Sequence, residues 1–291
     1  MFHVDQEIST QPQDWARAVA LADAVRGDLP ERGARAAFTG CGTSWFMSSA
    51  AAELREHAGQ GETDAFTSSE FNHLRHYDHV VAITRSGTTT EVIELLERLR
   101  GTTRTTVITA VPGSPVTAVA DRTILLDFVD EESVVQTRFA TTVLALIRVW
   151  LGQDLAKAIS DAEHALHEPV DAHASAEQIT FIGTGWTIAL AQEAALKTRE
   201  AAQFWSEAYP GMDYRHGPIS IAQRGRLVWC FGAVPEGLEA QVRATGAGFV
   251  SSTMDPMAHL VLAQRVAVEL AKVRGLNPDA PRNLTRSIIL E

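Results

Sequence analysis

The chain has 291 residues, 45% of them hydrophobic, so it is long enough to bury a large core in one domain or two. Its formal charge is −11 and its 25 lysines and arginines form no basic stripe, so nucleic acid is not expected as a partner. No apolar run reaches the roughly 18 residues of a membrane span, and the N-terminus lacks the pattern of a signal peptide. These features predict a cytoplasmic protein with no membrane partner.

Short apolar runs rich in β-formers alternate with helical patterns in the first half of the chain. Strands are predicted at 36–40, 80–84, 105–109 and 123–127. Helical spacing separates them, and two further helices are predicted near 137–151 and up to residue 165. The alternation favours an α/β fold in which helices flank a parallel sheet.

A polar stretch with a proline, 167–176, predicts a linker, after which the strand, turn and helix return. Residues 179–202 repeat the layout of 36–57, with Gly183-Thr184-Gly185 matching Gly40-Cys41-Gly42 at an offset of 143. Later elements are predicted at 227–234, 246–252 and 257–273, with a short helix among them. We therefore predict two related domains: 1–165, an N-terminal helix plus the first domain, and 166–291, a shorter copy with a C-terminal tail.

The cysteines and a group of histidines give little sign of a disulfide or a metal. Cys41 and Cys230 are expected to stay reduced and buried. His73, His76 and His79 are spaced by three, but the last adjoins a strand and no carboxylate or cysteine completes a ligand set. We expect a solvated surface there, with no metal and no cofactor.

Two turns after predicted strands are crowded with glycine and hydroxyl side chains, GCGTS at 40–44 and TRSGTTTE at 84–91. They fall at the carboxyl ends of parallel strands, where helix N-termini attract anions. The first turn lacks the third glycine of a dinucleotide site, and neither half of the chain has a P-loop ending. The turns predict a bound phosphate; helix capping is the alternative explanation for one or two of the hydroxyls.

These two turns resemble the first half of the sugar isomerase domain family. Residues 193–218, which end in His-Gly-Pro, and 279–291 resemble the isomerase half of glucosamine-6-phosphate synthase. The resemblance implies two tandem flavodoxin-like domains that bind a sugar phosphate. The substrate-binding residues that it implies are Ser44, Ser86 and Thr89, together with Gly42, Thr43, Thr84, Gly87 and Val134.

Arg85 stands where the synthase has a neutral residue. We include it among the substrate-binding residues, because a guanidinium there can make a charge-assisted bond to the ligand. A side chain that merely points to solvent is the alternative.

The resemblance also implies catalytic roles for Glu200 and His216, which match family positions sixteen residues apart. Lys197 precedes Glu200 by three residues on a helix, so it shares a face with the carboxylate and can hold it ionised. A carboxylate base takes the proton alpha to a carbonyl, which gives an enediol or enamine, and an imidazole can move the ring-opening proton. A surface charge and a simple turn residue are the alternatives for Glu200 and His216.

The chain departs from the synthase at Arg286, where the family has a lysine that forms an imine with the open ketose. Arginine stays protonated and cannot do so, and the chain has only three lysines, Lys157, Lys197 and Lys272. Arg286 is expected instead to hold an oxygen of the substrate. Only about 35 residues precede the first strand, so a glutaminase half is not expected.

Three functions fit these residues. The first is a phosphosugar isomerase or deaminase acting at C1–C2 of a hexose or hexosamine 6-phosphate. The second is a deglycase of fructosamine 6-phosphates, and the third is a regulator that binds a phosphosugar without catalysis. The family also implies a homodimer in which His216 reaches the site of the adjacent subunit.

Overall fold

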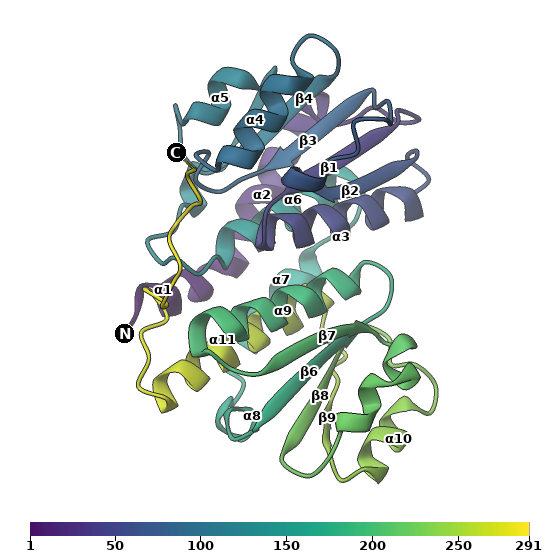
Figure 1. Ribbon diagram of the computed structural model, residues 1–291, viewed down its shortest axis with the longest axis vertical. Coiled ribbons are helices and arrows are strands. Elements are labelled where there is room, and N and C mark those ends of the chain that lie inside the picture. Colours follow the sequence, from purple (N-terminus) through teal and green to yellow (C-terminus); the bar gives the residue numbers. More distant parts are fainter. Residues whose placement is uncertain (291) are drawn as a thin grey trace. The chain divides into compact units, whose positions relative to one another are not determined.

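The computed structural model describes residues 1–290, which form two compact units, each built around one parallel sheet (Figure 1). The first-sheet unit comprises Gln13–Glu131, Arg138–Leu155 and the tail from Thr285. The second-sheet unit comprises Met1–Pro12, Glu132–Thr137 and Ala156–Leu284. The chain therefore passes repeatedly from one unit to the other.

The sheet of the first-sheet unit has the strand order β2-β1-β3-β4-β5, with every pair parallel. This is the order of flavodoxin-like folds. The strands are β1 (Ala36–Gly40), β2 (Thr63–Thr67), β3 (His79–Ile83), β4 (Arg104–Thr109) and β5 (Arg122–Leu125). The helices are α2 (Gln11–Val25), α3 (Thr43–His57), α4 (Thr90–Leu99), α5 (Pro115–Val119) and α6 (Arg138–Trp150), with 3₁₀ turns at Arg26–Asp28, Ser68–Glu70 and Asp127–Val129.

The core of this unit follows from the apolar spacing of α4 and the continuous apolar strands. β1 and β3 are buried along their whole length, as expected for parallel strands covered on both faces. Val92, Leu95, Leu96 and Leu99 recur at helical spacing and pack in the clusters that hold the β3 and β4 side chains.

The sheet of the second-sheet unit repeats that order without a fifth strand, as β7-β6-β8-β9, again all parallel. The strands are β6 (Gln178–Gly183), β7 (Ser206–Pro210), β8 (Arg226–Phe231) and β9 (Gly248–Val250). The helices are α1 (His3–Ser9), α7 (Ala156–Ala165), α8 (Asp171–Ala174), α9 (Thr187–Ala202), α10 (Leu238–Ala244) and α11 (Pro256–Val273), with 3₁₀ turns at Asp213–His216 and Pro218–Ile221. Helix α11 packs against both α9 and α7.

The predicted α/β fold with parallel sheets flanked by helices is confirmed, and the second sheet is the smaller copy. Two strands were not predicted, β2 and β7, and the segment predicted as a linker contains the short helix α8. The strands of the first sheet all precede residue 165 and those of the second all follow it; the boundary at 165 stays a prediction. No helix within residues 1–290 is long and apolar enough to cross a membrane.

The expectation of a solvated surface is wrong for His79. This residue begins β3, is 3% exposed, and its Nε2 lies 2.8 Å from the Thr106 hydroxyl. Burial lowers the pKa of His79 to about 4. His73 and His76 lie outside any helix, and residues 1–290 contain no cluster that could hold a metal ion.

Both cysteines are free thiols. Cys230 is fully buried, and burial raises its pKa to about 11, whereas Cys41 is only half-buried. Burial first, and then the charge of Glu91, raises the pKa of Cys41. These pKa shifts favour the protonated form of both thiols. The expectation of burial is confirmed for Cys230 and wrong for Cys41.

Candidate functional site

Glycines shape the turn between β1 and α3. Gly42 has φ +56° and ψ −125°, a conformation open to glycine and strained for other residues. A Cβ on Gly40 would lie 2.6 Å from the Ser44 Cβ and 2.9 Å from the Ile83 carbonyl oxygen. The missing side chain therefore allows the start of α3, with Ser44, to pack closely against the end of β1 and the neighbouring strand β3.

The turn between β3 and α4 is fixed by similar means. Gly87 has φ +66°, and a Cβ there would lie 2.0 Å from the Ser114 hydroxyl. Thr84 donates its backbone N–H to the Ile108 carbonyl, 3.0 Å away, and so extends the pairing of β3 with β4. Thr89 is the N-cap residue of α4. Because β1 and β3 are adjacent parallel strands, both hydroxyl-rich turns lie at the same edge of the sheet.

Three hydroxyls in these turns keep a free donor. The Ser44 and Thr89 hydroxyls have no hydrogen-bond partner within residues 1–290, and neither α3 nor α4 has a side-chain cap. The Ser86 oxygen accepts from the Thr88 N–H at 3.3 Å and the Thr88 hydroxyl at 3.0 Å, which leaves its own proton available. Capping does not explain these hydroxyls, whereas donation to an anion would use all three.

Arg85 does not point to solvent, so that alternative is wrong. Its side chain is 1% exposed, and its Nη1 lies 3.3 Å from the carboxylate of Glu131, which is fully buried. The backbone N–H of Arg138 also donates to Glu131, at 2.9 Å. Burying two charges is tolerable when they pair in this way. The Arg85–Glu131 pair thus links the turn after β3 to the segment before α6. A bond from Arg85 to a ligand stays a prediction.

The C-terminal tail lies against the same turn, with its yellow end beside α4 (Figure 1). The Ser287 and Thr88 hydroxyls are 2.9 Å apart, and the Thr90 N–H donates to the Ile288 carbonyl at 3.1 Å. Arg286 forms an ion pair with Asp130 and donates to a backbone carbonyl. The tail therefore satisfies one of the N–H groups that the start of α4 leaves open. The substrate contact expected of Arg286 stays a prediction.

In the second-sheet unit, helix α9 carries a buried group of three charges. Glu193, Lys197 and Glu200 follow one another at helical spacing, and the first two are 0% and 2% exposed. The Lys197 ammonium lies 3.6 Å from Glu193 and forms an ion pair with Glu200, whose side chain is 20% exposed. The expected pairing of Lys197 with Glu200 is confirmed, and Glu200 is not a simple surface charge.

The other candidates of this unit lie on loops. His216 ends a 3₁₀ turn, is exposed, and precedes Gly217, which has φ +140°. Val134 donates its backbone N–H to the Asp279 carbonyl at 3.0 Å. The candidate residues thus divide between the units. The hydroxyls of Ser44, Ser86 and Thr89 belong to the first-sheet unit with Arg85 and Arg286, and Val134, Lys197, Glu200 and His216 belong to the second.

The sequence reasoning missed two buried acids. Glu193 sits four residues before Lys197 in an alanine-rich helix, and this spacing is a signal for an ion pair. Glu131 lies 46 residues from Arg85, and no local pattern in the sequence links the two.

The sequence was compared with protein families and with curated proteins. No family model matches the chain. The chain is 26% identical to the isomerizing glutamine–fructose-6-phosphate aminotransferase of Bacillus subtilis, over 96% of its own length and 54% of that relative. It therefore spans about half the length of the curated relatives it matches.

Solved structures share the fold over nearly the whole chain. Glucosamine-6-phosphate deaminase from Thermotoga maritima has a TM-score of 0.86 at 22% identity, covering 99% of this chain and 100% of that one. Tagatose-6-phosphate ketose/aldose isomerase from Escherichia coli has a TM-score of 0.81 at 20% identity, covering 97% and 96%. The chain resembles sugar isomerase domain proteins. The resemblance predicted from the two hydroxyl-rich turns is confirmed.

Proposed function

We propose that the protein is a phosphosugar isomerase or deaminase that acts at C1–C2 of a hexose or hexosamine 6-phosphate. The observation that carries the proposal is the free donor capacity of Ser44, Ser86 and Thr89 at the starts of two adjacent helices. Such hydroxyls, with the helix N-termini, suit the dianionic phosphate of the substrate. The names of the similar proteins contain fructose 6-phosphate, glucosamine 6-phosphate and tagatose 6-phosphate, all six-carbon sugar phosphates.

The proposed chemistry assigns the proton transfer to Glu200. A carboxylate paired with an ammonium stays ionised and can accept the proton on the carbon alpha to the substrate carbonyl. Lys197 supplies that ammonium, and its burial keeps the pair in place. His216 is assigned the ring-opening proton, which an imidazole can both give and take. We further propose that the protein acts in the cytoplasm as a homodimer in which His216 serves the neighbouring subunit.

A deglycase of fructosamine 6-phosphates is the second candidate, and the state of the lysines favours it over a synthase-like route. All three lysines are held in ion pairs: Lys157 with Asp161, Lys197 with Glu193 and Glu200, and Lys272 with Asp5. Arg286 cannot form an imine. Release of an amine by acid and base catalysis needs no imine lysine.

The test is a panel of hexose, hexosamine and fructosamine 6-phosphates, with products followed by mass and binding followed by calorimetry. The double variant Ser86→Ala/Thr89→Val should weaken inorganic phosphate and sugar phosphate alike, because both lose the same donors. Thr102→Val is the matched control, since its hydroxyl donates to the Leu99 carbonyl at the other end of α4. Unchanged phosphate affinity in the double variant would refute the phosphate site. Binding without turnover of any panel member would instead indicate a regulator.

A further inference from the structure

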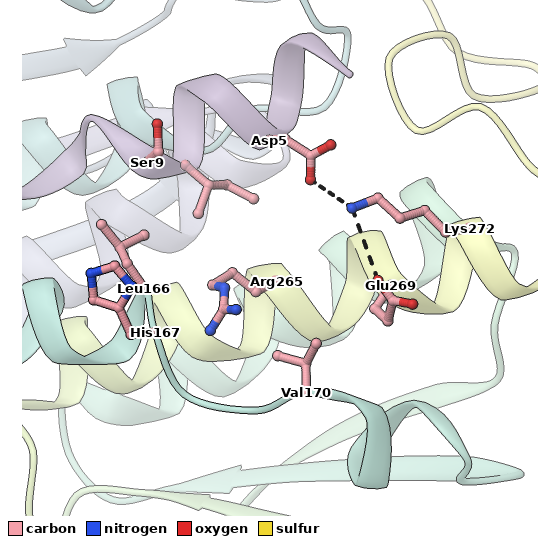
Figure 2. Close-up of a pocket in the computed structure, with 9 residues that line it drawn as sticks. Asp5, Ser9, Leu166, His167, Val170, Arg265, Glu269 and Lys272 are labelled. Carbon is pink, nitrogen blue, oxygen red and sulfur yellow. Dashed lines mark hydrogen bonds and ion pairs between the residues drawn. The ribbon is translucent and has the colours of Figure 1, made fainter. Parts of the chain in front are cut away.

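The second-sheet unit contains a cavity of about 280 Å³ that none of the candidate catalytic residues lines (Figure 2). It is bounded by α1, by α11 and by the segment that joins α7 to α8. Its apolar lining consists of Ile8, Leu166 and Val170, and Ile8 is only 2% exposed. Polar and charged side chains complete the walls.

Two hydrogen bonds anchor Arg265 in the wall of this cavity. Its Nη1 donates to the Ala165 carbonyl at 2.7 Å and to the Glu168 carbonyl at 2.6 Å, which fixes the guanidinium on the segment after α7. Its Nε and Nη2 have no hydrogen-bond partner within residues 1–290, and it forms no ion pair there. Burial lowers the pKa of Arg265, and the nearby charges of Glu168, Asp5 and Glu269 partly offset this effect. The arginine remains charged at neutral pH. Figure 2 shows this guanidinium on the same side of the cavity as His167.

The two acids that line the cavity, Asp5 and Glu269, already have a cation in Lys272. Lys272 lies 2.9 Å from Asp5 and 3.9 Å from Glu269, and Figure 2 draws both contacts. Asp5 also accepts the backbone N–H of Phe2 at 3.0 Å. The Nε and Nη2 donors of Arg265 remain open in this wall, and such donors suit an anion.

We propose that this cavity binds a small monocarboxylate with an apolar body of about the size of an amino acid. The carboxylate would take the free edge of Arg265 in a two-pronged contact, and the body would lie on Ile8, Leu166 and Val170. A cavity of about 280 Å³ is at the lower limit for a drug-sized ligand, so the ligand must be small. The site is separate from phosphosugar turnover, and it stands or falls independently of the proposed function.

The experiment is a titration of the full-length, ¹⁵N-labelled protein with isovalerate, observed by nuclear magnetic resonance. Saturable shifts are expected at the amides of Ser9, His167 and Val170. Arg265→Gln should weaken binding at least tenfold. Arg274→Gln is the matched control, because that guanidinium also donates to two backbone carbonyls, those of Ala202 and Gln203, but does not line the cavity. It should bind isovalerate as the unaltered protein does.

A second variant guards against a folding defect in Arg265→Gln. Ser9 is exposed at the end of α1, so Ser9→Phe should fill the cavity and abolish binding while Arg265 keeps its anchors; Ser9→Ala should bind normally. The absence of saturable shifts would overturn the proposal. Equal binding of the neutral isovaleramide would overturn the role of the charge, and equal binding of inorganic phosphate at these amides would overturn the role of the apolar body.

Discussion

The turn after β1 and the turn after β6 share the φ of one glycine and differ in their polar chemistry. Gly42 and Gly185, which the repeat aligns, both have φ +56°. In the first turn the Ser44 hydroxyl has no partner within residues 1–290. In the second, the hydroxyl of Thr187 accepts from the Thr184 N–H at 2.8 Å and lies 3.0 Å from the Phe231 carbonyl.

The comparison shows that the hydroxyl at this position of the turn can either bond within the protein or stay open as a donor. In the second-sheet unit the threonine closes the turn internally, and the loop after β8, Gly232-Ala233-Val234-Pro235, offers no hydroxyl. In the first-sheet unit the aligned residue, Ser44, has an open hydroxyl donor, and so do Ser86 and Thr89 after β3. Open hydroxyl donors thus lie in the first-sheet unit, while the second-sheet unit carries the paired charges of α9.

The largest effect that would test this division is on turnover. Glu200→Gln should lower kcat by at least 10²-fold, because it keeps the shape of the side chain and removes the base. Phosphate affinity should not change, since the hydroxyls belong to the other unit. Steady-state kinetics and phosphate calorimetry measure the two effects. Glu163→Gln, on the exposed side of α7, is the control, and a kcat within about threefold of wild type for Glu200→Gln would remove this residue from the role.

The shared φ of Gly42 and Gly185 predicts similar losses of stability in the two turns. Gly42→Ala and Gly185→Ala should each lower the free energy of unfolding by about 1–3 kcal/mol, because both force a Cβ into a conformation that favours glycine. Only Gly42→Ala should also weaken phosphate binding. Urea denaturation gives the first quantity, with Gly27→Ala as control because nothing lies within 4 Å of the added Cβ. A cost confined to one turn would break the structural equivalence.

Removing the Ser44 hydroxyl should affect phosphate binding, and removing the Thr187 hydroxyl should affect stability. Ser44→Ala should reduce phosphate affinity by about 1 kcal/mol, or roughly fivefold, and leave the free energy of unfolding unchanged. Thr187→Val should leave phosphate affinity unchanged and lower stability by about 1–3 kcal/mol, because the Thr184 N–H and the Phe231 carbonyl lose a partner. Calorimetry gives the phosphate affinity of both variants, and urea denaturation gives their free energy of unfolding. If Thr187→Val weakened phosphate binding, the comparison would fail.

The last prediction is that a trapping experiment for an imine leaves the protein unmodified. Borohydride reduction in the presence of a substrate sugar phosphate should leave the protein mass unchanged, because Arg286 has no nucleophilic amine and Lys197 is buried between two carboxylates. Mass spectrometry gives the answer, and the same reaction on an imine-forming aldolase serves as the positive control. A stable adduct on any of the three lysines would restore imine chemistry.

The sequence predicted those parts of the molecule that depend on neighbouring residues. β1 and β3 are continuous apolar runs, and Ser44, Ser86 and Thr89 stand out beside glycines. β2 and β7 were missed because Thr-Asp-Ala-Phe-Thr and Ser-Glu-Ala-Tyr-Pro are half-exposed strands at an edge of their sheets, without a continuous apolar run. The Arg85–Glu131 pair was missed because long-range pairing of charges leaves no periodic pattern in the sequence.

The exchange of segments between the two units has a consequence for cutting the chain. A break after Ala165 would leave residues 1–12 and 132–137 in the first fragment, where Val4 and Val134 lose their contacts with Asp279. The second fragment would carry Ser287 away from Thr88. Neither fragment would hold a whole unit, so each alone should fold poorly, whereas the two expressed together can complement one another.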